Sequence, residues 1–344
     1  MTDRLRVALV GAGRAGMVHG RNFAGGVPGC ELVAVTDPGP EPLKAAAKEL
    51  GIERTFSDPL AAAVAEDIDA VVIAAPTFTH AETAVAALET GKHVLCEKPI
   101  SNTLEEARRI GEAAQSSAGI FMMAFMRRFD AGFTRAAERI AAGDIGTPLM
   151  VRSTGRGPGL PPEWAWDVDR SGGLAAEVNS HDIDTIRWLS GQEPTRVYAV
   201  GRAAKRPDIA ERYPGFVDLL AGIIELSEGG IAQLDGACPA GYGYDARVEV
   251  YGSDGTLLVG GPTIADAPLL VRADGAVTDP VRSWRNLFAD AYREESRHFV
   301  AAARGLEEPR TSVVDGIQAL ATVLATNRSI ATGVRVDLSD VTGQ

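Results

Sequence analysis

The sequence predicts an α/β protein with an N-terminal, doubly wound parallel sheet and a C-terminal α+β domain. Up to about residue 125, short apolar runs alternate with helical patterns, which is typical of a parallel sheet with crossover helices. Beyond that point, strand-like runs follow one another and are joined by turn signals such as Glu228-Gly229-Gly230, which indicates a mostly antiparallel sheet. We therefore expect one domain at 1–125 and a second at 126–344.

The elements of the first domain can be placed in order. The run at 5–10 (LRVALV) stops at a glycine, as a buried parallel strand does. Two helical patterns end at Gly51 and Gly91, and glycine is the usual residue just after a helix. We expect strands at 5–10, 31–36, 69–75, 93–96 and 120–125, and helices at 13–24, 41–50, 79–90 and 103–114.

The second domain opens with a loop at 155–163 that is rich in glycine and proline (GRGPGLPPE). A single long helix is expected at 174–189, and two more near the end of the chain at 284–304 and 312–331. Strands are expected near 195–201, 217–226, 230–237, 246–251 and 256–259.

Composition excludes several classes of function. The formal net charge of the 344-residue chain is −12, which disfavours nucleic acid and anionic membranes because both need clustered Lys and Arg. The three cysteines, Cys30, Cys96 and Cys238, lie far apart and form no CxxC pair, so a disulfide framework or a zinc site is not expected. No apolar run has the length of a signal peptide or a membrane span, and we expect a cytoplasmic protein.

A glycine-rich turn follows the first strand and opens the first helix. It reads Gly11-Ala12-Gly13-Arg14-Ala15-Gly16. The first glycine allows a tight turn, the second lets a pyrophosphate approach the backbone, and the third lets helix and strand pack closely. The helix start supplies N–H groups and a positive dipole for phosphates. The complete context of strand, turn, helix and second strand predicts a dinucleotide-binding Rossmann domain.

Asp37 ends the second strand, 21 positions after Gly16, near the spacing of a ribose-binding carboxylate. A carboxylate there accepts hydrogen bonds from both ribose hydroxyls and repels a 2′-phosphate, so NAD is favoured over NADP. The alternative is an Asp-Pro-Gly turn that only ends the strand.

Glu97-Lys98-Pro99 follows another strand, and ligands of open α/β sheets bind beyond the carboxyl ends of the strands, so Glu97 and Lys98 are expected to contact the cofactor. A lysine there can stabilise alkoxide character during hydride transfer, although a solvated turn lysine is the alternative. Four more cofactor contacts are expected at the same edge: Ala75, Pro76, Thr77 and His80. Of these, His80 could touch the nicotinamide half.

On the expected helix 174–189, four residues fall within one arc: Glu177, His181, Asp184 and Trp188. A neutral imidazole can take a hydroxyl proton, and an adjacent carboxylate can orient it. The alternative is a solvated acidic face, although Trp188 indicates partial burial. No second histidine or cysteine accompanies this set, so no metal is expected. The remaining histidines, His19, His93 and His298, are expected to be structural.

Five ordered motifs give the chain a resemblance to the glucose–fructose oxidoreductase/inositol dehydrogenase family, closest to inositol 2-dehydrogenase-like members. The matching segments are 7–19 (VALVGAGRAGMVH), 70–101, 125–130 (FMRRFD), 171–191 and 290–305 (DAYREESRHFVAAARG). The resemblance implies a C-terminal domain whose open sheet mediates homodimer or homotetramer formation. It also implies oxidation or reduction of a ring hydroxyl of a cyclitol or sugar.

By that similarity, Lys98 is the catalytic lysine and His181 the general acid/base, while Asp184 binds substrate or positions the histidine. The family usually has aspartate where this chain has Glu177, and a small residue where it has Asn179, which puts the identity of the substrate in doubt. The segment Met126-Arg127 and Tyr292 are implied to border the substrate, and the expected substrate contacts are Lys98, Met126, Arg127, Trp166, Glu177, His181 and Tyr292.

Some alternatives stay open at this level. Trp164 and Trp166 follow the proline-rich stretch and could stack on a sugar ring or anchor a loop to the core. The leading function is an NAD-dependent dehydrogenase acting on CH–OH groups. The alternatives are a non-catalytic sensor of dinucleotide and sugar, or a glycosidase that uses NAD transiently.

Overall fold

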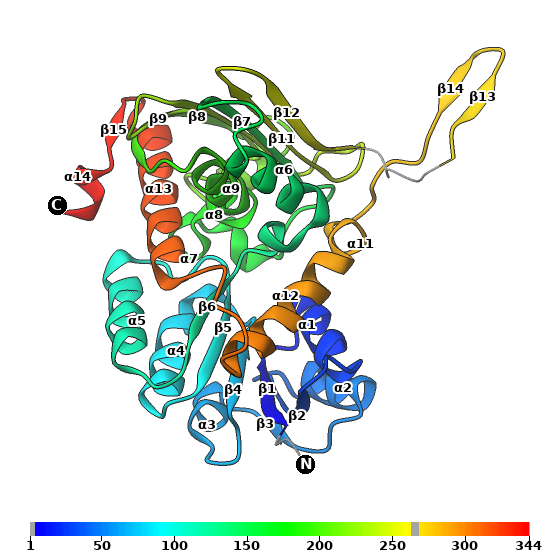
Figure 1. Cartoon of the computed structure of the whole chain (residues 1–344), viewed down its shortest axis with the longest axis vertical. Helices are drawn as coiled ribbons and strands as arrows, with labels where there is room; N and C mark the ends of the chain where they lie inside the picture. Colours follow the sequence, from blue (N-terminus) through cyan, green and yellow to red (C-terminus); the bar gives the residue numbers. More distant parts are fainter. Residues whose placement is uncertain (1–3, 263–267, 344) are drawn as a thin grey trace. The chain divides into compact units, whose positions relative to one another are not determined.

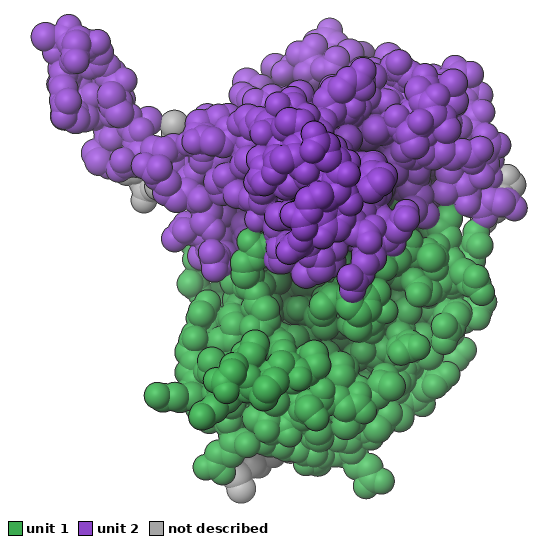
Figure 2. All heavy atoms as spheres, turned by 180° about the vertical axis from the view of Figure 1, so that it is seen from behind, with its two compact units in different colours: residues 1–129, 290–320 green, residues 130–289, 321–344 purple. Residues whose placement is uncertain are grey.

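The computed structural model describes residues 4–262 and 268–343, which form two compact units. Unit 1 comprises residues 1–129 and 290–320, and unit 2 comprises residues 130–289 and 321–344 (Figure 2). The predicted domain division at residue 125 stays a prediction. The units differ from it because residues 290–320 pack with the N-terminal part, and Phe299 and Val300 join its hydrophobic core.

Unit 1 contains a six-stranded, fully parallel sheet in the order β3-β2-β1-β4-β5-β6 (Figure 1). This is the strand order of the dinucleotide-binding Rossmann fold. Its strands are β1 (Leu5–Val10), β2 (Cys30–Thr36), β3 (Thr55–Phe56), β4 (Ala70–Ile73), β5 (His93–Glu97) and β6 (Phe121–Ala124). Every residue of β4 and β6 is buried, as expected for strands covered on both faces.

The helices of unit 1 form two groups. Helices α3, α4 and α5 pack side by side, and α1 packs on α2 (Figure 1). The helices are α1 (Arg14–Ala24), α2 (Pro40–Leu50), α3 (Pro59–Val64), α4 (His80–Glu89), α5 (Leu104–Ser116) and α12 (Ala289–Ala303), with short 3₁₀ turns η1 (Thr77–Thr79) and η2 (Met126–Phe129). A capping box at Thr103 and Glu106 begins α5.

Unit 2 contains a seven-stranded sheet in the order β12-β11-β7-β10-β9-β8-β15. Only the β7–β10 pair is parallel among the described pairs of this sheet, so the predicted mostly antiparallel sheet is confirmed. The strands are β7 (Pro148–Arg156), β8 (Pro194–Arg202), β9 (Leu219–Leu226), β10 (Ile231–Ala237), β11 (Asp245–Gly252), β12 (Thr256–Gly261) and β15 (Val336–Asp337). Sequence reasoning missed β7, whose residues 150–156 contain no long apolar run.

One face of this sheet is covered by helices, because α9 packs along β7 and contacts β10 and β11. The remaining elements are α6 (Ala131–Ala141), η3 (Glu163–Trp166), α7 (Val168–Ser171), α8 (Gly173–Glu177), α9 (Ser180–Ser190), α10 (Pro207–Arg212), the hairpin β13 (Leu270–Arg272) and β14 (Gly275–Val277), α11 (Trp284–Leu287), α13 (Val313–Thr332) and α14 (Ser339–Thr342). In the described residues, no helix is long and apolar enough to cross a membrane.

Candidate active site

The glycine turn of unit 1 has the geometry that its sequence predicts. Gly11 follows β1 with φ of 99°, and a Cβ atom there would lie 2.6 Å from the carbonyl oxygen of Ala74. A Cβ atom at Gly16 would lie 1.9 Å from the Gly11 carbonyl oxygen, so this close contact between helix and turn requires glycine. At Gly13 no described atom lies within 4 Å of the Cβ position, which leaves the backbone open to a ligand.

Helix α1 begins directly after this turn. Its N-cap is Gly13, which supplies no side-chain hydrogen bond, and no acidic residue lies in the first turn. Arg14 is exposed and Ala15 half-buried, so the first N–H groups of the helix lie at its accessible end. Unsatisfied N–H groups and the positive end of the helix dipole suit a pyrophosphate. The residues present therefore fit NAD at this turn.

Asp37 holds a fixed carboxylate beside the same turn. Its Oδ2 accepts a hydrogen bond from the backbone N–H of Ala12 at 2.9 Å, and its Oδ1 accepts one from Gly39 at 2.8 Å. The end of β2 is thus tied to the turn after β1. Each carboxylate oxygen retains a further lone pair, so ribose hydroxyls can still be bound. This contact goes beyond a simple Asp-Pro-Gly turn.

Both ring nitrogens of His80 contact backbone carbonyl oxygens at the edge of the sheet. Its Nδ1 lies 2.9 Å from the carbonyl oxygen of Pro99, and its Nε2 lies 2.9 Å from that of Ala75. Burial lowers the pKa of His80 although both carbonyl contacts oppose this effect. A neutral imidazole donates to one of the two oxygens. Pro76 is half-buried and Thr77 buried, and the predicted cofactor contacts here stay predictions.

Glu97 is the last residue of β5, and Lys98 follows it at the carboxyl edge of the sheet. The Glu97 Oε1 lies 3.0 Å from His19 Nε2, and Oε2 accepts a hydrogen bond from the Lys98 backbone at 3.1 Å. Burial opposes ionisation of Glu97, but the His19 hydrogen bond and the charges of His19 and Lys98 outweigh it and lower its pKa. The Glu97 carboxylate thus has hydrogen-bond partners in the interior of unit 1. Its predicted contact with the cofactor stays a prediction.

Two residues of α12 lie in the interior of the same unit. Tyr292, a predicted substrate contact, is 3% exposed, and its ring meets the His19 ring edge-on with centroids 5.3 Å apart. Glu295 is fully buried, and sequence reasoning missed it. The available signal was its spacing of three residues from Tyr292, which places both on one helix face.

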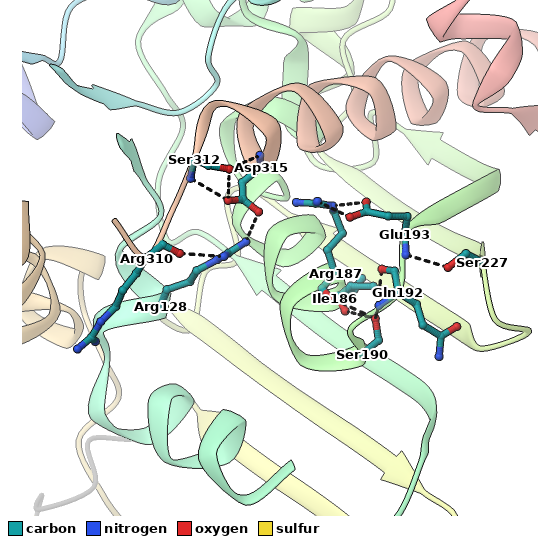
Figure 3. A network of polar contacts seen from close by, with 10 residues as sticks. All are labelled: Arg128, Ile186, Arg187, Ser190, Gln192, Glu193, Ser227, Arg310, Ser312 and Asp315. Atoms are coloured by element: carbon teal, nitrogen blue, oxygen red, sulfur yellow. Dashed lines mark hydrogen bonds and ion pairs between the residues drawn. The ribbon is translucent and has the colours of Figure 1, made fainter. Parts of the chain in front are cut away.

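The predicted substrate residues Met126 and Arg127 lie in η2, after β6, and both are 1% exposed. Their neighbour Arg128 donates to Asp315 Oδ1 at 2.7 Å and to the carbonyl oxygen of Arg310 at 3.2 Å (Figure 3). Asp315 also accepts from the Ser312 backbone at 2.8 Å, so the segment after β6 is tied to the first turn of α13.

In unit 2, the expected single helix at 174–189 is wrong, because α8 ends at Glu177 and α9 begins at Ser180. The N–H groups of Val178 and Asn179 both bond to the Leu174 carbonyl, which closes α8 before a new helix starts. Glu177 therefore does not lie on the helix of His181 and Asp184. The expected arc of four residues on one helix is therefore wrong, because only His181, Asp184 and Trp188 share α9.

Asn179 lies at this break, and its side chain bonds to the first turn of α9 and to the sheet. Its Nδ2 donates to Asp182 Oδ2 at 2.9 Å and to the carbonyl oxygen of Asp235 on β10 at 3.1 Å. Ser153 on β7 donates to Asp182 Oδ1 at 2.7 Å. The first turn of α9 is thereby anchored to two strands. Sequence reasoning noted Asn179 only as an unusual residue.

His181 and Asp184 lie on α9 at a spacing of three residues and are 7% and 1% exposed, whereas Glu177 is half-buried. Burial of this kind contradicts the solvated acidic face that was the alternative. The far end of α9 is fixed separately, because Arg187 forms two hydrogen bonds of 2.6 Å with the carboxylate of Glu193 (Figure 3).

Trp166 lies in η3 of unit 2 and is engaged locally. Its Nε1 donates to the carbonyl oxygen of Pro161 at 3.0 Å, and its ring meets Tyr213 edge-on at 5.9 Å. These contacts match loop anchoring, and the predicted stacking on a substrate ring stays a prediction.

Comparison with known proteins agrees with this architecture. Residues 5–125 match the oxidoreductase family with an NAD-binding Rossmann fold (GFO_IDH_MocA), and residues 133–258 match the GFO/IDH/MocA C-terminal domain. A scyllo-inositol 2-dehydrogenase (NAD(+)) of Bacillus subtilis is 34% identical over 98% of this chain and 97% of its own. A myo-inositol 2-dehydrogenase of Thermotoga maritima is 30% identical over 98% and 100%.

Among solved structures, the scyllo-inositol dehydrogenase of Lactobacillus casei with bound NAD(H) and scyllo-inositol is 29% identical. It superposes with a TM-score of 0.91 and covers 98% of this chain and 100% of its own. The predicted α/β fold class, the NAD-dependent oxidoreductase activity and the family resemblance are confirmed. The chain belongs to the GFO/IDH/MocA family of NAD-binding oxidoreductases.

Proposed function

We propose that this protein is an inositol dehydrogenase that oxidises one ring hydroxyl of an inositol with NAD as the hydride acceptor. The observation that carries the proposal is the position of Lys98 within unit 1. It directly follows β5 at the carboxyl edge of the parallel sheet that also carries the glycine turn and Asp37. Ligands of open α/β sheets bind at this edge. The inositol dehydrogenases named above support the substrate class.

In the proposed reaction, Lys98 stabilises the reacting oxygen and His181 removes its proton. When bound, NAD supplies a nicotinamide ring that accepts a hydride. In our proposal the Lys98 ammonium donates to the reacting hydroxyl oxygen and stabilises its alkoxide character. His181 takes the hydroxyl proton as general base. Glu177 and Asp184 orient the ring or the histidine, and the further predicted contacts are Met126, Arg127, Trp166 and Tyr292.

The test is NADH formation across a panel of inositols, aldoses and amino sugars. We expect an inositol, with scyllo- and myo-inositol as the first two compounds, to give the highest kcat/KM. Turnover of an aldose alone would contradict the substrate class. Dinucleotide binding without turnover of any compound would indicate a sensor, and glycosidic cleavage without NADH accumulation would indicate the glycosidase alternative.

We also propose that the protein assembles as a homodimer or homotetramer through the uncovered face of the unit 2 sheet. Tyr198 on β8 and Ile223 on β9 are paired neighbours in register, and both are more than 40% exposed. Leu258 on β12, 74% exposed, pairs with Glu249. Exposed apolar residues on one face are typical of protein interfaces. A monomeric mass by light scattering would contradict this proposal.

A cytoplasmic location is proposed as well. It is supported by the three cysteines, all within the described residues, which are buried and form no disulfide. Retention of activity after complete thiol reduction is the expected result, since a structural disulfide would make reduction destabilising.

A further inference from the structure

Three elements of unit 1 carry buried titratable side chains, and one of them is Glu97, the residue before Lys98. His19 on α1 and Glu295 on α12 are 0% exposed, and Glu97 at the end of β5 is 6% exposed. His19 lies within hydrogen-bond distance of Glu97, and its ring meets that of Tyr292, a further buried residue of α12, edge-on. The proposed hydride chemistry uses none of these side chains except Tyr292 as a substrate contact.

The two carboxyls of this group are in opposite surroundings. Glu97 has two hydrogen-bond partners: His19 Nε2 lies 3.0 Å from its Oε1, and the Lys98 backbone N–H donates to its Oε2. No donor among the described residues lies within hydrogen-bond distance of either oxygen of Glu295. A buried carboxylate without donors is far more costly than a neutral carboxylic acid. The geometry alone therefore favours an ionised Glu97 beside a neutral Glu295.

The charges around Glu295 agree with this assignment. Burial raises its pKa well above the ordinary range, and the negative charge of Glu97 raises it further. The other charged groups of α12 are engaged elsewhere: Asp290 pairs with Arg293, Glu294 pairs with Arg297, and His298 pairs with Glu307. Cys96, next to Glu97 in β5, is kept as a neutral thiol because burial raises its pKa.

We propose that Glu97 and Glu295 form a buried carboxyl pair that carries one negative charge in total. Glu97 is ionised and acts as a positioning residue for Lys98. Glu295 stays protonated, so that it adds no second negative charge. This inference rests on the catalytic role proposed for Lys98. The Glu97 carboxylate accepts a hydrogen bond from the backbone N–H of Lys98 and so fixes the start of the segment that follows β5. A second negative charge at Glu295 would repel Glu97 in a medium that screens poorly.

Infrared spectroscopy of the intact protein at neutral pH tests the pair without any substrate. A protonated carboxylic acid has a carbonyl stretch that a carboxylate lacks. We expect this band in the wild type, its loss in Glu295→Gln, and its retention in Glu294→Gln, the matched control one residue away. Absence of the band from the wild type, or its persistence in Glu295→Gln, would overturn the assignment of the proton.

Kinetics on the most active inositol test the positioning role. Glu97→Gln removes the charge, so we expect kcat to fall by at least about tenfold. The kcat/KM profile against pH should also shift, because the variant removes the negative charge that interacts with Lys98. Glu97→Asp should recover part of both effects, and Glu295→Gln, which stays neutral, should move the profile less than Glu97→Gln.

A profile that moves more in Glu295→Gln than in Glu97→Gln would overturn the proposed positioning role. A folded Glu97→Gln variant with an unchanged profile would do the same; thermal unfolding checks that it is folded. If no inositol is turned over, the proposed function fails, while the infrared bands still decide whether the carboxyl pair exists.

Discussion

The imidazole Nε2 of His19 lies 3.0 Å from the carboxylate Oε1 of Glu97, and the His19 side chain is fully buried. His19 belongs to α1, the helix that begins at the glycine turn, and Glu97 ends the strand that precedes Lys98. One interior contact therefore joins the element that fits the dinucleotide to the segment that carries the proposed catalytic lysine.

Replacing Lys98 by methionine should remove most turnover and leave NAD binding intact. Methionine keeps much of the length of the side chain but cannot donate to the reacting oxygen, and a group of this kind contributes about 100-fold or more to the rate. Steady-state kinetics together with calorimetric NAD titration measure the two effects. Lys44→Met, at an exposed position on α2, is the control and should match the wild type. Unchanged turnover in Lys98→Met would remove Lys98 from the mechanism.

Replacing Asp37 by alanine should weaken the preference for NAD over NADP. The variant loses the carboxylate that fits the ribose hydroxyls and the acceptor for Ala12 and Gly39. Loss of one hydrogen bond to a charged group raises the KM for NAD by about tenfold. The KM for NADP should fall relative to it, because the repulsion of the 2′-phosphate is gone. An unchanged ratio of the two kcat/KM values would show that Asp37 only ends the strand.

Replacing Gly155 by alanine should destabilise unit 2 and disturb the start of α9. The new Cβ would lie 2.1 Å from Asp182 Oδ2, the oxygen that accepts from Asn179. Overpacking of this kind costs about 2 kcal/mol. Gly159→Ala is the control, since no described atom lies within 4 Å of its Cβ position. Denaturant unfolding compares the two variants, and equal stabilities would contradict the role of Gly155.

The stability of Glu295→Gln relative to the wild type should increase with pH. In the unfolded chain, a glutamate loses its proton near pH 4.3, about the ordinary value. Burial raises the pKa of Glu295 in the folded protein, so the folded state keeps the proton that the unfolded state has lost. The stabilisation from this group is therefore complete below about pH 4 and declines as the pH rises toward the folded pKa. Glutamine does not titrate, and the variant avoids this loss.

The measurement is the free energy of unfolding of both proteins between pH 5 and pH 8, as an approximate working range. The difference should grow by up to about 1.4 kcal/mol per pH unit. Glu294→Gln should differ from the wild type by a nearly constant amount over this range, because its hydrogen bond to Arg297 lowers the pKa of Glu294 and the resulting stabilisation is already complete above the unfolded pKa. A pH-independent difference for Glu295→Gln would contradict a buried neutral acid.

Much of the fold could be predicted from local patterns. Short apolar strands ending at glycine or aspartate specify the parallel sheet, because buried strands and their turns have strong composition signals. β7 was missed, since its middle residues are held by pairing with β10 and β11 rather than by their own hydrophobicity. Long-range pairing leaves little trace in local sequence.

The parts of the site where a sequence motif determines the backbone conformation could be predicted. Contacts between side chains from different helices and strands were harder to predict. The glycine turn and Asp37 lie together as their spacing predicts. At the break between α8 and α9, the Asn179 side chain bonds to the carbonyl oxygen of Asp235 on β10, and helical periodicity does not reveal such a contact. The contacts of His19 with Glu97 and Tyr292 likewise join residues from three distant segments.

In the proposed reaction, a hydride passes from a ring carbon of an inositol to the nicotinamide of NAD, and Lys98 stabilises the oxygen on that carbon. Incubation with NAD and an inositol deuterated at its ring carbons tests it directly, with the dinucleotide analysed by mass spectrometry and NMR. We expect one deuterium at C4 of the nicotinamide ring in the wild type, and transfer at least about 100-fold slower in Lys98→Met. Reduced dinucleotide without deuterium, or equal transfer by Lys98→Met, would contradict it.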